Sequence, residues 1–259
     1  MLRLFEHPLS PYAQKVKILL REKGIAFDTQ VPDGIGAGTT GGEFTAANPR
    51  AEVPVLIDDD TAVFDSTIIL EYIEEKWPEP AIAPRSPAER ARARMIEDVM
   101  DTQVEAIIWG LGELNFFGRA DGELKAEMEE TAARQLSSFF GWLEGELKDG
   151  PWFNGTQFGW ADICIVPYLN GAAGFDILPE SGSALSAWFA SANARPSVAE
   201  TQSESVASIG NMELVKAAVE QGLFKRQYRD HRLEWMMKSG GREIVLSGLD
   251  AGNIRFTGP

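Results

Sequence analysis

The stretch FEHPLSPYAQKVKILLREKG, residues 5–24, decides the fold of the first part of the chain. With the residues before it, LRLFEH predicts a buried strand, and the turn PLS leads into a helix that ends at Gly24. The apolar positions of this helix recur at helical spacing: Tyr12, Val16, Leu19 and Leu20. The run AFDTQVP, residues 26–32, predicts a second strand. Strand, helix and strand in this order indicate a βαβ unit with parallel strands and a right-handed crossover.

The next segment predicts a loop and then a hairpin followed by a helix. Residues 33–42, DGIGAGTTGG, have no strand directly before them and no helix directly after, as a phosphate-binding loop requires, so we expect a flexible loop. VPVLIDDDTAVFD, residues 53–65, has two apolar runs around a turn, and DSTIILEYIEEKW, residues 65–77, has helical periodicity. The expected order over residues 1–77 is therefore βαβ, loop, ββα.

A proline-rich linker divides the sequence into two predicted domains. PEPAIAPRSP, residues 78–87, contains four prolines, and long helical patterns follow it. We expect an α/β domain over residues 1–78, a linker over 79–87, an all-helical domain over 88–238 and an extended C-terminal tail over 239–259. The expected helices, with no strand among them, cover residues 88–117, 123–148, 160–173, 183–194 and 211–238.

Composition excludes several classes of protein. The formal net charge of −15 and the absence of a lysine or arginine run argue against a nucleic acid partner, since phosphate binding needs a basic surface. No apolar window is long enough for a membrane span, and the N-terminus lacks a signal core, so we expect a cytoplasmic protein with no membrane partner. One cysteine, Cys164, precludes an internal disulfide and is expected to pack in a helix. With only two histidines and no HExxH pattern, we expect no metal.

The order of elements and four motifs together resemble the soluble glutathione transferases. The motifs are SPYAQKVKILL at residues 10–20, NPRAEVPVL at 48–56, DSTIILEYIEEKWP at 65–78 and FGWADICIVPYL at 158–169. The resemblance covers nearly the whole chain. It implies a thioredoxin-like N-terminal domain followed by an all-helical domain, glutathione as co-substrate, and a homodimer.

Ser10 has a structural and a functional interpretation. Serine before proline is a favoured helix start, although Ala13 stands where the Glu or Gln of a capping box would be. A group at a helix N-terminus also lies where negative charge is favoured. The resemblance to serine-type transferases implies that the Ser10 hydroxyl donates a hydrogen bond to the glutathione sulfur and lowers a thiol pKa that starts near 8.5. Tyr12 is the rival donor, though its place on the apolar face favours a core role. Relatives with cysteine at this position can form a mixed disulfide with glutathione, which serine cannot.

Two further elements of the expected glutathione site rest on the same resemblance. Only about 5–6% of X-Pro bonds in folded proteins are cis, but the resemblance implies a cis Pro54 that turns the Val53 backbone outward to pair with the cysteinyl unit. Asp65 and Ser66 suit a helix cap. The resemblance adds that Ser66 and the helix N-terminus hold the γ-glutamyl carboxylate while Asp65 pairs with the amino group.

The glycyl carboxylate of glutathione has no clear partner in the sequence. Arg50 is a possible one, because residues 33–42 contain no lysine, arginine or histidine. In FGWAD, Asp162 matches the family's helix start, but Gly159 stands where serine or threonine is usual. This motif concerns folding rather than catalysis.

The electrophile pocket is expected between the domains, lined from the long helices. WGLGELNFFG, residues 109–118, supplies the candidates Trp109, Asn115, Phe116 and Phe117, although aromatic residues at helical spacing more often belong to the core. We hypothesise that the helical extension and the tail cover the open side of the pocket.

The resulting prediction is a glutathione transferase that directs the thiol at an electrophilic, apolar or aromatic substrate, in detoxification or aromatic catabolism. A narrower version is glutathione-dependent aryl ether cleavage, as in some bacterial relatives. The alternatives are a glutathione-dependent disulfide reductase, which needs no protein cysteine, and a non-catalytic binding or scaffold protein.

Overall fold

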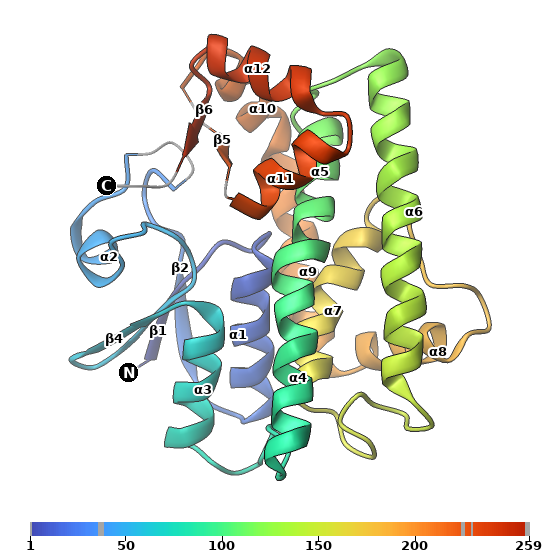
Figure 1. Cartoon of the computed structure of the whole chain (residues 1–259). Coiled ribbons are helices and arrows are strands. Elements are labelled where there is room, and N and C mark those ends of the chain that lie inside the picture. Colours follow the sequence, from blue (N-terminus) through green and yellow to red (C-terminus); the bar gives the residue numbers. More distant parts are fainter. Residues whose placement is uncertain (1, 36–38, 224–225, 229, 257–259) are drawn as a thin grey trace.

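The structure is a computed structural model that describes residues 2–35, 39–223, 226–228 and 230–256. A small sheet with its helices occupies one side of the molecule, and a larger group of helices packs beside it (Figure 1). The two regions follow one another in the sequence, as predicted.

The sheet has four strands in the order β2-β1-β3-β4. They are β1 (Leu2–Phe5), β2 (Phe27–Gln30), β3 (Val55–Asp58) and β4 (Thr61–Phe64). β1 pairs in parallel with β2, while β3 is antiparallel to both β1 and β4. The predicted βαβ unit and hairpin are therefore confirmed.

The helices of this first region lie on both faces of the sheet. α1 (Pro11–Glu22) and α3 (Ser66–Lys76) contact each other on one face, and the short α2 (Gly42–Ala47) lies against the other. Phe44 of α2 packs there with Phe5 and Val55. α2 was not predicted, because six residues are too few for a periodic pattern. The predicted loop, residues 33–42, ends where α2 begins, and its residues 36–38 lie outside the described residues.

The second region begins with a helix that changes its winding in the middle. α4 (Pro87–Val99) runs into a π-helical turn, η1 (Met100–Val104), and then into α5 (Glu105–Asn115). The single predicted helix over residues 88–117 is therefore wrong in its interior, because a π turn inserts an extra residue that no apolar pattern marks. The next three predicted helices are confirmed as α6 (Gly122–Leu147), α7 (Trp160–Ala173) and α8 (Ala184–Asn193).

After α8 the structure departs from the prediction. α9 (Pro196–Ser208), followed by the short 3-10 turn η2 (Ile209–Asn211), was not predicted. Pro196 occupies the first turn of α9, where its missing N–H is harmless.

The predicted helix over residues 211–238 is also wrong. It divides into α10 (Met212–Glu220), the strand β5 (Arg226–Tyr228) and α11 (Asp230–Lys238). Gly222, with φ at 71°, allows the left-handed backbone that ends α10.

The predicted extended tail over residues 239–259 is wrong as well. It contains α12 (Arg242–Asp250) and the strand β6 (Ile254–Phe256), which pairs in parallel with β5. α12 also contacts α11. The C-terminal part of the chain is therefore a folded subunit of the helical region, with residues 257–259 outside the described ones.

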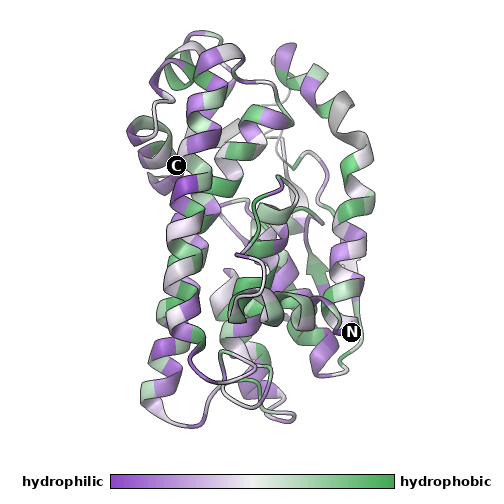
Figure 2. Ribbon diagram, turned by 90° about the vertical axis from the view of Figure 1, so that its right-hand side faces the viewer, coloured by the Kyte–Doolittle hydropathy of each residue, from purple (hydrophilic) through white to green (hydrophobic). Residues whose placement is uncertain are grey.

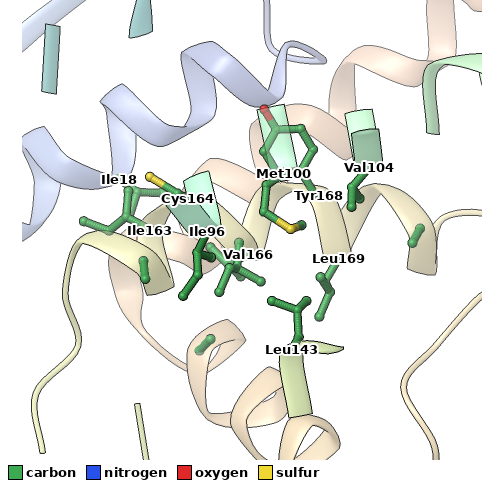
Figure 3. Packing of buried hydrophobic residues seen from close by; sticks show 14 of the residues in the cluster. Ile18, Ile96, Met100, Val104, Leu143, Ile163, Cys164, Val166, Tyr168 and Leu169 are labelled. Carbon is green, nitrogen blue, oxygen red and sulfur yellow. The ribbon is translucent and has the colours of Figure 1, made fainter. Parts of the chain in front are cut away.

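A continuous apolar core joins the two regions. α6 buries one stripe at helical spacing: Met128, Ala132, Leu136, Phe140, Leu143 and Leu147. The helices show hydrophobic and hydrophilic residues in alternating bands (Figure 2). Figure 3 shows Ile18 of α1 near Ile163 and Cys164 of α7. Cys164 is fully buried and burial raises the pKa of its thiol, so its predicted packing role is confirmed.

The start of α7 explains why glycine replaces the usual serine or threonine. Asp162 accepts hydrogen bonds from the Gly159 N–H at 2.9 Å, the Phe153 N–H at 3.0 Å and the Trp188 Nε1 at 2.7 Å. A Cβ atom on Gly159 would lie 2.4 Å from the Asn154 side-chain nitrogen. The site of a capping side chain is therefore occupied, and Asp162 supports the helix start alone.

Candidate active site

A cleft of about 360 Å³ lies where the sheet region meets α4 and η1. The predicted glutathione-site residues that line it are Tyr12, Arg50, Val53, Pro54, Asp65 and Ser66. The opposite wall carries Arg94, Glu97, Asp98, Asp101 and Thr102. The cleft is thus built from both regions of the chain, and both walls are rich in charge.

Ser10 lies at the N-terminus of α1 and caps it. Its side chain accepts a hydrogen bond from the Ala13 N–H at 3.4 Å, so the capping interpretation is confirmed. Ser10 is half-buried and is absent from the residues that line the cleft. Among the described residues, none accepts a hydrogen bond from its hydroxyl, which leaves the proton available for an external acceptor.

Tyr12 uses its hydroxyl within the protein. The hydroxyl donates to the backbone carbonyl of Asp101 at 2.7 Å, and the ring packs edge-on against Tyr168. The residue therefore has a packing role and also lines the cleft. Its proton is committed to a carbonyl, which makes it a weaker donor than Ser10 for an incoming thiolate.

The loop before β3 and the start of α3 form one end of the cleft. The Val53–Pro54 bond is cis, as the resemblance implied. Asp65 has φ at 74° and accepts hydrogen bonds from the Thr67 N–H at 3.1 Å and the Ile68 N–H at 3.4 Å. The capping role of Asp65 is confirmed, and Ser66 is buried at the first position of α3.

Arg50 lies at the same end of the cleft and contacts carboxylates. Its Nη2 is 2.8 Å from Glu52 and its Nη1 is 3.8 Å from Asp65. The side chain is half-exposed. An incoming ligand carboxylate would therefore compete with Glu52 for this guanidinium.

A buried charge cluster beneath the cleft was missed by sequence reasoning. Lys15 of α1 lies 2.8 Å from Glu97 and 2.6 Å from Asp101, and its side chain is completely buried. Thr67 donates to Glu97 at 2.8 Å, which connects the cluster to α3. A signal was present, since Lys15 falls four residues before Leu19 on the apolar stripe of α1.

Burial and mutual charge act in opposite directions on this cluster. Burial raises the pKa of Asp101 to about 6 and Glu97 adds to the increase, although Lys15 opposes both. Burial also acts to raise the pKa of Glu97, but Lys15 outweighs it and the pKa falls below its usual range. Burial alone would lower the pKa of Lys15, but the two carboxylates raise it. Lys15 is therefore held as a cation.

The predicted electrophile residues lie apart from this cleft. Trp109 is half-buried, with the Arg232 guanidinium 5.0 Å from its ring centre, and Asn115 is exposed and donates to the Leu111 carbonyl at 3.1 Å. Phe116 packs against Phe175, and Phe117 is buried. Within the described ranges, none of the four lines the cleft or the second cavity.

The second cavity, of about 460 Å³, lies between η1, α5, α6 and α11. It combines aromatic and polar side chains: Phe139, Trp235, Gln135, Ser138, His231 and Lys238. Trp235 donates from Nε1 to Gln135 at 2.6 Å. Thr102 lines both this cavity and the cleft, so the two hollows meet at η1.

A thioredoxin-like sheet region followed by helices, with a cis proline and a capped helix facing a shared cleft, defines the class of the glutathione transferases. Two family models match: the glutathione S-transferase N-terminal domain over residues 9–76 and the C-terminal domain over residues 99–196. Glutathione S-transferase U28 of Arabidopsis thaliana is 33% identical over 167 residues, which cover 62% of this chain and 68% of that protein.

Solved structures agree with these sequence matches. A Tau class glutathione S-transferase from mango has a TM-score of 0.69 at 25% identity, covering 83% of this chain and 98% of its own. Rice GST1, solved in complex with glutathione, has a TM-score of 0.66 at 23% identity, covering 83% of this chain and 96% of its own, and shows the shared fold. The chain belongs to the glutathione S-transferase family and is an enzyme of that family.

Two searches of the described residues gave no candidates. Across residues 2–35, 39–223, 226–228 and 230–256, no helix is long and apolar enough to cross a membrane. In the same part of the chain, no group of three or more histidine, cysteine, aspartate or glutamate side chains is placed to hold a metal ion.

Proposed function

We propose that this glutathione transferase is of the serine type and activates glutathione through Ser10. The observation that carries the proposal is the position of the Ser10 hydroxyl at the N-terminus of α1, where it accepts from Ala13 and keeps its own proton for another acceptor. A hydroxyl donor and the helix dipole both favour the thiolate over the thiol. The cap and the catalytic role are thus compatible in one side chain.

Glutathione fits the cleft as a ligand with opposite charges at one end. The N-terminus of α3 with Ser66 receives the γ-glutamyl carboxylate, and Asp65 pairs with the amino group. The backbone of Val53 before the cis Pro54 pairs with the cysteinyl unit. Arg50 is the candidate for the glycyl carboxylate and would exchange Glu52 for it.

The thiolate then attacks an electrophilic carbon of a small apolar or aromatic substrate. The carbon–sulfur bond forms as the bond to the leaving group breaks, the leaving group departs with the electron pair, and the thiol proton has already gone to solvent. Positioning and thiolate stabilisation supply the catalysis. The second cavity, with Phe139 and Trp235, supports an aromatic substrate because it meets the cleft at Thr102. Trp109, Asn115, Phe116 and Phe117 stay predictions for this pocket.

The wider setting of the enzyme is part of the proposal. We expect a cytoplasmic homodimer with no nucleic acid, membrane or metal partner, which acts in detoxification or aromatic catabolism. The expected domain limits are residues 1–78 and 88–238. The C-terminal segment that follows, with α12 and β6, is folded and contacts α11. Aryl ether cleavage is the narrower form of the same chemistry.

The test is a titration of bound glutathione by the ultraviolet absorbance of its thiolate, in wild type and Ser10→Ala. We expect a bound thiol pKa well below the free value of about 8.5 in wild type, and a higher value in the variant. Saturable binding without a change between the two proteins would remove Ser10 from the mechanism. No saturable binding would contradict the proposed function itself.

A further inference from the structure

The cleft needs positive charge that its lining residues do not supply. Five carboxylates line it, from Glu52, Asp65, Glu97, Asp98 and Asp101, against two guanidinium groups. Arg50 pairs with Glu52, and Arg94 pairs with Glu71. A thiolate placed here meets a field of its own sign, which raises the pKa of a thiol. A further cation close to the sulfur would reverse that effect.

Arg232 of α11 is a cation fixed beside this cleft. Its Nε donates to both carboxylate oxygens of Glu105 at 3.1 Å, and its Nη2 also bonds to Glu105. The guanidinium lies over the Trp109 ring at 5.0 Å. With only 11% of its side chain exposed, Arg232 is held in one place by a carboxylate and an aromatic face.

The guanidinium retains donors that its anchor does not use. Among the described residues, Glu105 is the hydrogen-bond partner of Nε and Nη2, and none accepts from Nη1. Glu105 itself is buried and is shared with His231, whose Nε2 lies at 3.0 Å. Arg232 is thus fixed by one edge and has its other edge available.

The charges of the cleft act on Arg232 directly. Burial alone would lower the pKa of its guanidinium, but Glu105 raises it, and Tyr12 and Glu52 raise it further. Because Coulomb interactions decay with distance, Tyr12 and Glu52 lie close to Arg232. Both residues line the cleft, which places the guanidinium on the side where Tyr12 stands. Tyr12 follows Ser10 by two residues on α1.

We propose that Arg232, carried by α11 and positioned by Glu105 and Trp109, supplies the positive charge that stabilises the glutathione thiolate together with the Ser10 hydroxyl. This inference rests on the proposed function and adds a residue to the same site. It also gives Trp109 a role, which is to orient the guanidinium. The residue lies beyond residue 196, where the match to the C-terminal family model ends, so it is a property of this chain's extension.

The test compares the pKa of the bound thiol in wild type, Arg232→Gln and Arg232→Lys, with glutathione as the probe. A charge within about 6 Å shifts a pKa by about one unit or more, so we expect Arg232→Gln to raise the bound thiol pKa by at least about one unit. Arg232→Lys keeps the charge and should retain most of the lowering. Affinity for S-methylglutathione, which has both carboxylates but no ionisable sulfur, should stay within about twofold of wild type.

A matched control separates charge from docking of the C-terminal segment. Arg119 donates to Asn253 at 3.1 Å and pairs with Glu113, so it holds the same segment from outside the cleft. Arg119→Gln should leave the bound thiol pKa unchanged.

Several results would overturn the inference. A thiol pKa in Arg232→Gln equal to wild type, while Ser10→Ala raises it, removes Arg232 and leaves the proposed function intact. Equal increases in Arg232→Gln and Arg232→Lys, or in Arg119→Gln, show that packing and not charge is responsible. Parallel loss of S-methylglutathione binding shows that Arg232 contacts a ligand carboxylate. Absence of glutathione binding in wild type overturns the proposed function and this inference together.

Discussion

Lys15 of α1 lies 2.8 Å from the carboxylate of Glu97 on α4, and neither side chain is exposed to solvent to any useful extent. The same ammonium group is 2.6 Å from Asp101 in η1. One buried lysine therefore joins the helix that begins at Ser10 to the opposite wall of the cleft. Because such a cation has no water to replace its partners, its removal leaves two uncompensated carboxylates.

Lys15→Met should destabilise the protein by about 3–5 kcal/mol, because breaking a buried ion pair strands the remaining charge. Urea unfolding measures this loss. Adding Glu97→Gln and Asp101→Asn to the same protein should restore part of the stability, since the stranded charges are then gone. A triple variant less stable than Lys15→Met alone would show that the three groups do not act as one unit.

Tyr12→Phe distinguishes the two candidate hydroxyl donors. The variant loses the hydrogen bond to the Asp101 carbonyl at 2.7 Å, which should cost about 1 kcal/mol of unfolding free energy. The pKa of bound glutathione should not change, because the Tyr12 proton already has an acceptor. A rise in thiol pKa as large as that of Ser10→Ala would assign Tyr12 to the chemistry instead.

Asp65→Asn tests the glutathione end of the cleft with little effect on the helix cap, since asparagine also caps helices. We expect the dissociation constant of glutathione to rise about tenfold, which corresponds to ~1.4 kcal/mol for a lost charged partner. The thiol pKa in the bound state should stay as in wild type. Ser86→Ala, which removes the N-cap of α4 away from the cleft lining, is the control and should leave affinity unchanged. Equal losses in both variants would point to folding.

Asp162 gives the protein a stability term that depends on pH. Burial raises the pKa of Asp162 from 3.8 to about 6 in the folded state, with no charged partner involved. Between these values the folded state binds more protons than the unfolded state, so stability falls as pH rises from about 4 to about 6 and levels off above. Two pKa units at ~1.4 kcal/mol each give about 3 kcal/mol.

The measurement is the difference in unfolding free energy between wild type and Asp162→Asn as a function of pH. This difference should be largest near pH 4 and shrink by up to about 3 kcal/mol by pH 7, because only wild type has the titrating group. A difference that grows over the same range would show that the folded pKa is lowered rather than raised.

Gly110 sets how closely α11 approaches α5. A Cβ atom at Gly110 would lie 2.2 Å from the Trp235 ring, so Gly110→Ala should displace α11 and cost about 1–3 kcal/mol. If Arg232 acts from α11, the variant should also raise the thiol pKa of bound glutathione. Gly112→Ala is the matched control in the same helix, because its Cβ would meet only Phe116 at 3.6 Å. The inference would lose support if both variants behaved alike.

The sheet region was predictable because each element carries a strong local signal. The strand before Ser10, the helix stripe through Val16 and the hairpin around Asp59 follow period and turn chemistry, and the structure reproduces them. The C-terminal part was not predictable in the same way. Its strands β5 and β6 have three residues each, and their pairing is non-local, so no short window contains it.

The candidate site was predicted where motif residues are adjacent in sequence and missed where distant residues meet. Pro54, Asp65 and Ser66 come from such motifs, and the structure brings them to one cleft. Lys15 and Arg232 act through partners far away in the chain, which a single sequence does not reveal. The aromatic candidates after Trp109 were placed by counting along a regular helix. The extra residue of η1 turns the following helix by about 100°, which changes the face that each residue occupies.

The separation of Glu105 and Arg232 by 127 residues has a consequence during synthesis. The sheet region and the first helices leave the ribosome well before α11, and N-terminal regions fold first. A nascent chain can therefore form the cleft and the Ser10 cap while Glu105 and Trp109 still lack their cation. The order of translation thus makes the acidic, inactive form of the site precede the complete one, and a chain cut before α11 would keep the first form permanently.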